Sequence, residues 1–409
     1  RRVLFRSELG NQNTSNLYPF YEILPVKSNS GNWLVNGGKT NTADIPSLVS
    51  TLLTWERVRS FNVGFDFGAF SNRLTGSFDY FVRKTVDMVG PAPQLPLVLG
   101  IAPAIVNNAD MKSYGFEIEL SWRDRIGEVD YGVKFNLADA QQKVVKYPNT
   151  TNAFNDWYAG KMSGEIWGYT SLGIAKTDEE MKEHLASLPN GGQNQLGNKW
   201  GAGDIMYADI NGDGKVDGGK GTLADPGDQR IIGNSTPRYN FGLVLDASYK
   251  GFDVSIFFQG VGKRDYAPIV GTNGAVFWGA VNNIWQSMAM EEHFDYFRPE
   301  GHPMGANLNG YYPRPDFTSN KNHQVQTRYL QDASYIRLKN LQIGYTLPKQ
   351  WINKLHINRC RVYVSGDNLW TGTSLASMFD PETLAAGDWG SGKTYPLSKV
   401  ISFGLNVNF

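Results

Sequence analysis

The segment ADINGDGKVDG carries carboxylate and amide side chains at alternate positions, a spacing that could hold a metal ion. Calcium prefers oxygen ligands, and loops of the EF-hand type supply them from positions 1, 3, 5, 7 and 9, with a glycine at position 6. Gly214 takes that sixth position. The candidate ligands, in order, are Asp209, Asn211, Asp213, the carbonyl oxygen of Lys215, and Asp217.

Position 12 of this loop departs from the calcium pattern, because Lys220 stands where a bidentate glutamate would close the site. The insertion GGKGTLADPG can deliver Asp225 or Asp228 in its place, and we expect Asp228 to complete the site. The same letters also form Asn-Gly and Asp-Gly pairs, which are typical of turns with solvated carboxylates. The sequence therefore allows either a Ca²⁺ loop or two consecutive turns.

The remaining polar residues lack the spacing of a catalytic centre. Five histidines are scattered without metal-ligand spacing, and the sequence has no nucleophile signature of the serine–histidine–aspartate type. Glu117 and Glu119 could form the carboxylate pair of a glycosidase, but on one face of a strand they favour the wall of a wet interior. Lys plus Arg and Asp plus Glu are both 39, so no net charge attracts nucleic acid. We expect no enzymatic activity.

Tryptophans in the long connecting segments are candidate ligand contacts, because flat aromatic faces can stack on sugar rings while nearby polar groups fix orientation. Each of them could equally pack inside a folded loop. The candidates are Trp157, Trp167, Trp278, Trp285 and Trp389.

The elements that must position these residues are strands. In the closing VISFGLNVNF, Ile401, Phe403 and Leu405 alternate with polar or glycine positions, and successive side chains of a strand point to opposite faces. Nine segments show this pattern, and residues 17–26 are a weaker candidate. Several alternate for about nine residues or more, the length that a tilted strand needs to cross a bilayer, whereas strands of soluble sandwiches usually run about five or six.

Tight turns alternate with long links between these strands, which is typical of membrane barrels with short periplasmic turns and long extracellular loops. The sequence thus predicts an all-β, antiparallel transmembrane β-barrel. A soluble carbohydrate-binding β-sandwich with structural Ca²⁺ and a secreted glycoside hydrolase are the alternatives. The tight turns are at 70–73, 123–128 and 249–252, and the long loops at about 89–111, 146–237, 264–332 and 371–395.

Residues 17–409 are expected to form this barrel portion, and residues 1–16 are expected to be non-native or unassigned. The opening RRVLFRSELG lacks the apolar stretch of a signal peptide. Nine strands with two free edges cannot lie in lipid, because unpaired backbone groups there are costly. We therefore expect the strands that complete the barrel to precede residue 1.

Several stretches, together with the terminal Phe409, resemble TonB-dependent outer-membrane transporters of the SusC/RagA type from Bacteroidetes. They span residues 53–409 in unbroken order. The stretches are LTWERVRSFNVGFDFGAFSNRLTGSFDYFVRKTVDMV, GEIWGY, YADINGDGKVDG, DPGDQRIIGNSTPRYNFGL, DASYIRLKNLQIGYTLP and RVYVSGDNLW.

The resemblance implies a 22-stranded barrel with a plugged lumen, of which this chain supplies the C-terminal part without the plug domain. It implies a multi-pass protein of the Gram-negative outer membrane, surrounded by outer-membrane lipid. It also implies a SusD-like surface lipoprotein as partner, energy from TonB–ExbB–ExbD through the plug, and glycan import, with peptide import of the RagA type as the alternative. Phe409 would be the assembly signal.

Overall fold

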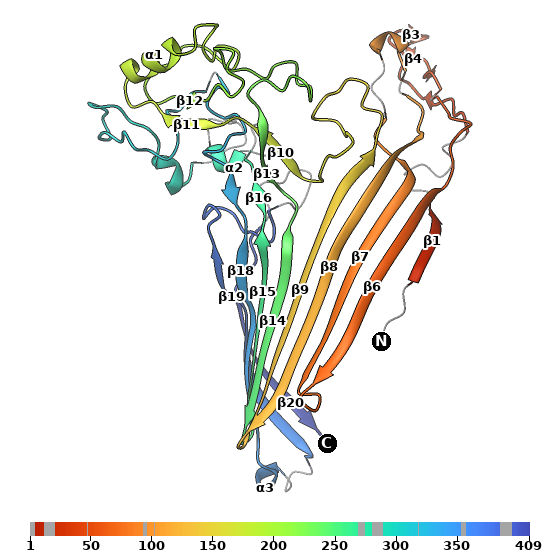
Figure 1. The fold of residues 1–409 in the computed structure, drawn as a ribbon, viewed down its shortest axis with the longest axis vertical. Helices are drawn as coiled ribbons and strands as arrows, with labels where there is room; N and C mark the ends of the chain where they lie inside the picture. The colour runs from red at the N-terminus through yellow and green to blue at the C-terminus, as the bar shows by residue number, and fades with distance from the viewer. Residues whose placement is uncertain are drawn as a thin grey trace.

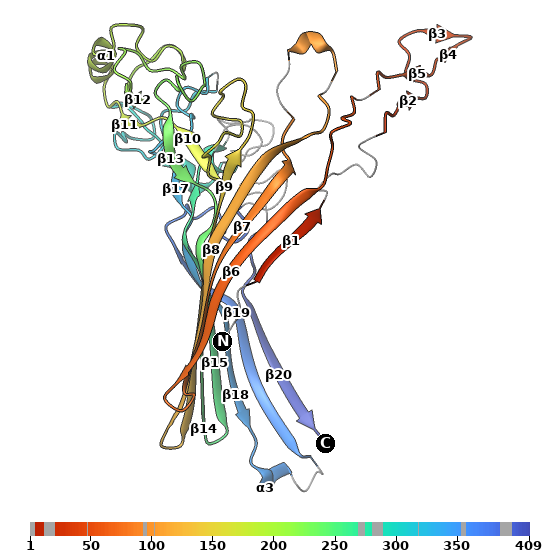
Figure 2. The same ribbon diagram turned by 45° about the vertical axis from the view of Figure 1, so that its right-hand side comes forward.

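The computed structural model describes residues 5–11, 21–46, 48–92, 96–101, 103–268, 275–279, 289–317, 319–352, 357–384 and 395–409. Its centre is a curved, ten-stranded antiparallel sheet with folded loops at one end (Figures 1 and 2). The sheet order follows the chain: β1 (Phe5–Asn11), β6 (Glu56–Ala69), β7 (Leu74–Val89), β8 (Asn107–Ile126), β9 (Val129–Lys146), β14 (Arg238–Tyr249), β15 (Phe252–Lys263), β18 (Tyr335–Thr346), β19 (Arg359–Thr373) and β20 (Val400–Asn408).

Short elements make up the connections. Five two-stranded pairs are β2 (Val26–Lys27) with β5 (Thr42–Ala43), β3 (Leu34–Val35) with β4 (Gly38–Lys39), β10 (Glu165–Gly168) with β13 (Arg230–Asn234), β11 (Ser171–Ile174) with β12 (Ile205–Tyr207), and β16 (Asp265–Tyr266) with β17 (Gln331–Asp332). The helices are α1 (Asp178–Ala186), α2 (Ala275–Trp278), α3 (Lys349–Ile352) and the 3-10 turns η1 (Leu97–Leu99) and η3 (Glu291–Phe294). No described helix is long and apolar enough to cross a membrane.

The strand register aligns apolar residues on one face of the large sheet. Cross-strand partners form a continuous row through Phe65, Phe78, Ile118, Leu137 and Phe241. Side chains on this face are left open, as in Phe403, which is 86% exposed. A face this apolar and this exposed is what a lipid-facing surface requires.

Tight turns join neighbouring strands at the end opposite the long loops (Figure 1). Between β14 and β15, Lys250 and Gly251 both have positive φ, at 46° and 91°. Two-residue hairpins of the primed type need positive φ at both central positions, because only then does the turn match the twist of the strands. The long strands leave residues 90–106, 147–237, 264–334 and 374–399 between them on the loop side.

All nine predicted strands are present in the sheet, and the tenth differs from our expectation. It is β1, whose residues Phe5–Asn11 pair with Glu56–Asn62 of β6. Residues 21–25 of the weaker candidate form no strand, and residues 17–20 lie outside the described part of the chain. Part of the stretch expected to be non-native or unassigned, 1–16, is therefore a sheet strand. Residues 5–11 form a strand because their backbone pairs with the edge of β6. They have no long apolar alternation that would have predicted the strand.

The hydrophobic core lies in the loops rather than in the sheet. The buried cluster includes Tyr169, Tyr207, Phe277, Trp278 and Tyr329. The sheet contributes little to it, since its apolar face points outward. The loops above β9, β14, β15 and β18 thus fold into a body with its own core, which we call the loop body (residues 147–237, 264–268, 275–279, 289–317, 319–334 and 374–384).

Candidate functional site

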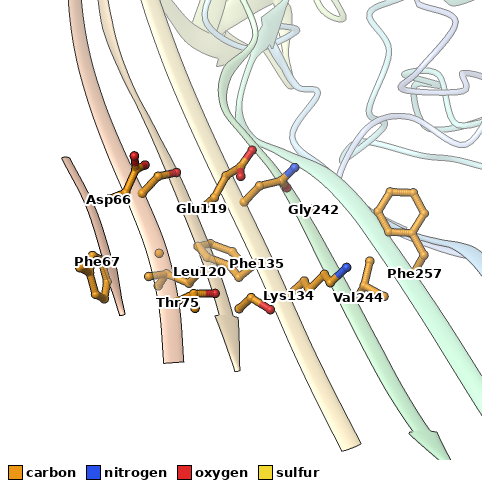
Figure 3. Close-up of a pocket in the computed structure, with 14 residues that line it drawn as sticks. Asp66, Phe67, Thr75, Glu119, Leu120, Lys134, Phe135, Gly242, Val244 and Phe257 are labelled. Atoms are coloured by element: carbon orange, nitrogen blue, oxygen red, sulfur yellow. The ribbon is translucent and has the colours of Figure 1, made fainter. Parts of the chain in front are cut away.

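The polar face of the sheet forms the wall of an open cavity of about 570 Å³. Figure 3 shows Asp66 on β6, Glu119 on β8 and Lys134 on β9, with β7 lying between β6 and β8 in the sheet. The register places Asp66 opposite Ser77, Ser77 opposite Glu119, and Glu119 opposite Asn136. Glu119 belongs to a wall of charged and hydrogen-bonding groups, and Glu117, which stands opposite Asp79 of β7, lies on the same face. Such a wall can hold water or a polar solute at its surface.

Salt-bridged pairs join strands and loops near this wall. The Arg361 guanidinium of β19 pairs with Asp253 of β15, and the contact spans the intervening strand β18. Nearer the loops, Arg337 is 3% exposed and pairs with Asp380 at 2.8 Å and with Glu382 at 3.1 Å. These last two contacts attach the segment after β19 to the wall, so part of that loop is held against β18.

A buried ionic cluster holds the loop body together. Asp204 is fully buried and accepts hydrogen bonds from Lys321 at 2.9 Å, Asn322 at 2.9 Å and Arg314 at 2.6 and 2.7 Å. The Lys321 ammonium also lies 4.9 Å from the ring centroid of Trp200. A buried carboxylate with this many charged donors is fully compensated, and the cluster fixes Arg314, Lys321 and Asn322 onto the 198–204 segment.

The predicted ligand tryptophans occupy different environments. Trp157 is half-buried with its ring 6.0 Å from Tyr147, and Trp167 is half-buried and stacked on Phe154 at 4.5 Å. Trp278 is 3% exposed and its indole donates to the Pro268 carbonyl at 3.2 Å. Trp285 and Trp389 lie outside the described residues. No ring contact joins the three of these tryptophans that the structure describes, Trp157, Trp167 and Trp278.

An apolar pocket of about 200 Å³ opens in the loop body beside Trp278. Its wall is aromatic, and the exposed rim includes Phe294 and Phe317, at 53% and 63% exposure. His323 also lines it, is 1% exposed, and has a ring nitrogen Nδ1 without a hydrogen-bond partner among the described residues. Burial lowers the pKa of His323 to about 4. The pocket therefore offers a neutral imidazole and aromatic faces to a ligand group.

The acidic loop 209–228 folds around its own backbone. Asp209 accepts from the amides of Gly212 at 2.6 Å and Gly214 at 2.8 Å, and Asn211 accepts from the amide of Asp213 at 2.9 Å. Gly214 has φ +79°, a left-handed conformation that favours glycine at this turn. This turn geometry fits both the Ca²⁺ loop and the two consecutive turns that the sequence allows.

Asp228 reaches back across the insertion and lies within the loop. Its carboxylate is fully buried and accepts from the amides of Ile210 at 2.7 Å and Asp217 at 2.8 Å. Burial is the main cause of a raised pKa at Asp228, with the charge of Asp209 adding to it. Lys215 forms an ion pair with Asp217. Among the described residues, no group of three or more His, Cys, Asp or Glu side chains is arranged to hold a metal ion.

Sequence reasoning missed the Asp204 cluster and the apolar pocket. Lys321 and Asp204 are 117 residues apart, and no local spacing joins them. The only signal was the density of aromatic residues in the loops, which indicates a packed core but not its members.

Comparisons with known proteins agree with this geometry. The model of the family described as TonB dependent receptor-like, beta-barrel matches residues 6–369. TonB-dependent receptor P3 of Formosa agariphila is 28% identical over 99% of this chain and 39% of its own length. TonB-dependent receptor SusC of Bacteroides thetaiotaomicron is 20% identical over 89% of this chain and 33% of its own length.

Among solved structures, the RagAB peptide transporter superposes with a TM-score of 0.71 at 23% identity, covering 99% of this chain and 40% of the matched chain. That likeness shows the same fold. The chain spans between one third and two fifths of the length of the relatives named here. Its relatives are outer-membrane receptors and transporters rather than enzymes. The chain therefore belongs to the TonB-dependent receptor-like β-barrel family of the outer membrane.

Proposed function

We propose that the protein containing this chain imports an oligomeric nutrient across the outer membrane. The observation that carries the proposal is the two-faced sheet, apolar outward and charged inward, with a folded loop body at one end. The polar wall supplies hydrogen-bond partners along a path through the membrane, and the loop body supplies surfaces on which a solute can be held first. Import then needs no chemical step on the solute.

Two partners complete the proposed cycle. A SusD-like surface lipoprotein would cover the loop body, and TonB–ExbB–ExbD would supply energy through a plug domain. The support is family membership and the likeness to SusC and to the RagAB structure. In this scheme the present chain provides the wall and the outer surface.

An oligosaccharide is the first candidate substrate. The wall around Asp66, Glu119 and Lys134 presents donors and acceptors suited to hydroxyl groups. Trp157 and Trp167 are half-buried and lie in the loop body, where a partly open ring can stack on a sugar.

A peptide is the second candidate, and one observation favours it. The wall of the pocket beside Trp278 is mainly apolar and aromatic, although His293, Arg314 and His323 also line it. An apolar side chain would fill it without losing hydrogen bonds, whereas a sugar would leave hydroxyl groups unpaired there.

We further propose that Ca²⁺ binds the acidic loop through Asp209, Asn211, Asp213, the Lys215 carbonyl, Asp217 and Asp228. The support is the alternate spacing, the left-handed Gly214 and the return of Asp228 into the loop. Bound calcium would fix the loop conformation. For Phe409 we propose the role of terminal assembly signal; it is 81% exposed after β20.

The function is tested by uptake into cells that carry the complete transporter or its deletion, using a labelled oligosaccharide mixture and a labelled peptide mixture. We expect the deletion to abolish uptake of one class. Trp167→Ala should reduce sugar uptake and Phe294→Ala peptide uptake, while Leu172→Ala, an exposed apolar loop residue, serves as control. Unchanged uptake of both classes by the deletion strain would contradict the proposal.

A further inference from the structure

A row of basic side chains crosses four neighbouring strands on the outward face of the sheet. Arg59 stands directly opposite Lys84, Lys84 opposite Lys112, and Lys112 opposite Lys143. These positions continue the alternation of the lipid-facing residues: Lys84 follows Tyr80 and Val82, and Lys112 precedes Tyr114 and Phe116. The row therefore points away from the polar wall and toward the surrounding membrane.

The height of the row places it at a membrane boundary. Trp122 and Lys112 are ten residues apart on β8, which corresponds to about 34 Å at about 3.4 Å per residue. A strand tilted by about 40° rises about 26 Å over that length, and the apolar band of outer-membrane barrels is about 25 Å tall. Since Trp122 packs against Phe70 of the tight turn between β6 and β7, Lys112 lies at the outer edge of the band, on the side of the long loops.

In the described part of the chain, the row has too few carboxylates nearby to neutralise its positive charges. Directly opposite side chains on a sheet have Cβ atoms about 5 Å apart, where like charges repel. Glu8 of β1 stands opposite Arg59, so the argument rests on the three lysines. Among the described residues, the ion pairs include none between Lys84, Lys112 or Lys143 and a carboxylate.

The lysines are accessible to a ligand in the membrane. Lys84 and Lys143 are exposed, and Lys112 is half-buried with its ammonium 5.2 Å from the ring of Tyr114. On the same face, the next residues toward the membrane are Tyr114 and Gln141. They line a cavity of about 360 Å³, and Arg238 is also part of its wall. Charged and polar groups thus continue beside the row.

We propose that this row binds the phosphate groups of phosphorylated glycolipids in the outer leaflet of the outer membrane. Basic clusters at the edge of a membrane span attract anionic lipid headgroups, and a phosphate offers several oxygen acceptors to neighbouring ammonium groups. The headgroup sugar would lie toward the polar cavity, and the acyl chains along the apolar face below. The lipid would offset the repulsion within the row.

The test uses the complete transporter purified in detergent, with bound lipid counted by native mass spectrometry. The probes are diphosphorylated lipid A, its dephosphorylated form, and excess inorganic phosphate as competitor. The wild-type protein should prefer the phosphorylated lipid, and inorganic phosphate should displace little of it. Replacing all three lysines with glutamine should remove the preference for the phosphorylated lipid. Each replacement should weaken the apparent affinity for that lipid by about fivefold.

Two further variants separate the role of charge from damage to the fold. Arginine at the same three positions should keep the preference, because the charge is kept. Glutamine at Lys176, Lys182 and Lys349, three exposed lysines elsewhere, should also keep it. Equal binding of both lipids by the wild type, full displacement by inorganic phosphate, or an unchanged preference in the Lys84/Lys112/Lys143 glutamine variant would each overturn the proposal.

Discussion

Arginine at Leu243 should destabilise the barrel far more than arginine at a neighbouring position of the other face. Leu243 stands opposite Phe135 and Phe258 on the apolar side. It lies six residues above Tyr249 on β14, which is about 20 Å along the strand and about 16 Å in height at a tilt of about 40°. That height is within about 4 Å of the middle of a band about 25 Å tall, where arginine costs about 2–4 kcal/mol.

Asn136→Arg is the matched control, because Asn136 is next to Phe135 but points to the polar wall. Glu119 stands opposite it on β8 and would accept the new charge, so the loss should be less than about 1 kcal/mol. Phe403→Arg and Asn406→Arg on β20 form a second pair with the same expected contrast. Free energies of unfolding come from urea titration of the complete barrel folded into phospholipid vesicles. Equal losses on the two faces would refute the lipid assignment.

Three further predictions concern the loop body. Asp213→Ala should abolish the heat of Ca²⁺ binding in calorimetry of the complete transporter, and heats equal to those of the wild type would remove the calcium proposal. Asp204→Asn should lower the stability of the loop body by about 3–5 kcal/mol, because it leaves Lys321 buried without the carboxylate of Asp204. Resistance of the loops to limited proteolysis measures this loss. The control is Glu128→Gln, which breaks an exposed ion pair and should cost less than about 1 kcal/mol. Burial depresses the pKa of His323 to about 4 in the folded protein, so the unfolded state binds a proton at this histidine first as the pH falls. The stability of the loop body should therefore decline between about pH 6.5 and about pH 4, by about 3 kcal/mol in total. A His323→Gln variant should lack this decline.

The sheet was predictable from the sequence because its signal is local. In β8 and β20 the apolar side chains recur every second residue, since one face meets lipid and the other meets water. The same signal fails for β1, which is short and mixed in polarity, and whose place depends on the backbone edge of β6. Register shifts such as the one between Phe257 and Phe258 also carry no local mark.

The candidate site was predictable only in part, because the loop body depends on contacts between distant segments. Trp278 and Trp157 are both tryptophans of long loops, yet Trp278 is buried in the core and Trp157 is half-buried. The Asp204 cluster joins segments about 117 residues apart. By contrast, the acidic loop was recognisable, because its turns are closed by neighbours such as Asp209 and Gly214.

Lipid contact along β20 tests the central claim most directly. Cys360 is the single cysteine of this chain. After serine replaces it and any cysteine in the rest of the complete transporter, a spin label can be placed at each position from 401 to 408 in turn. Oxygen, which concentrates in lipid, and a water-soluble nickel chelate then report the surroundings of each label. We predict high oxygen accessibility at 401, 403, 405 and 407 and low oxygen accessibility at the positions between them. Water contact at every position, with no repeat of two residues, would contradict the account.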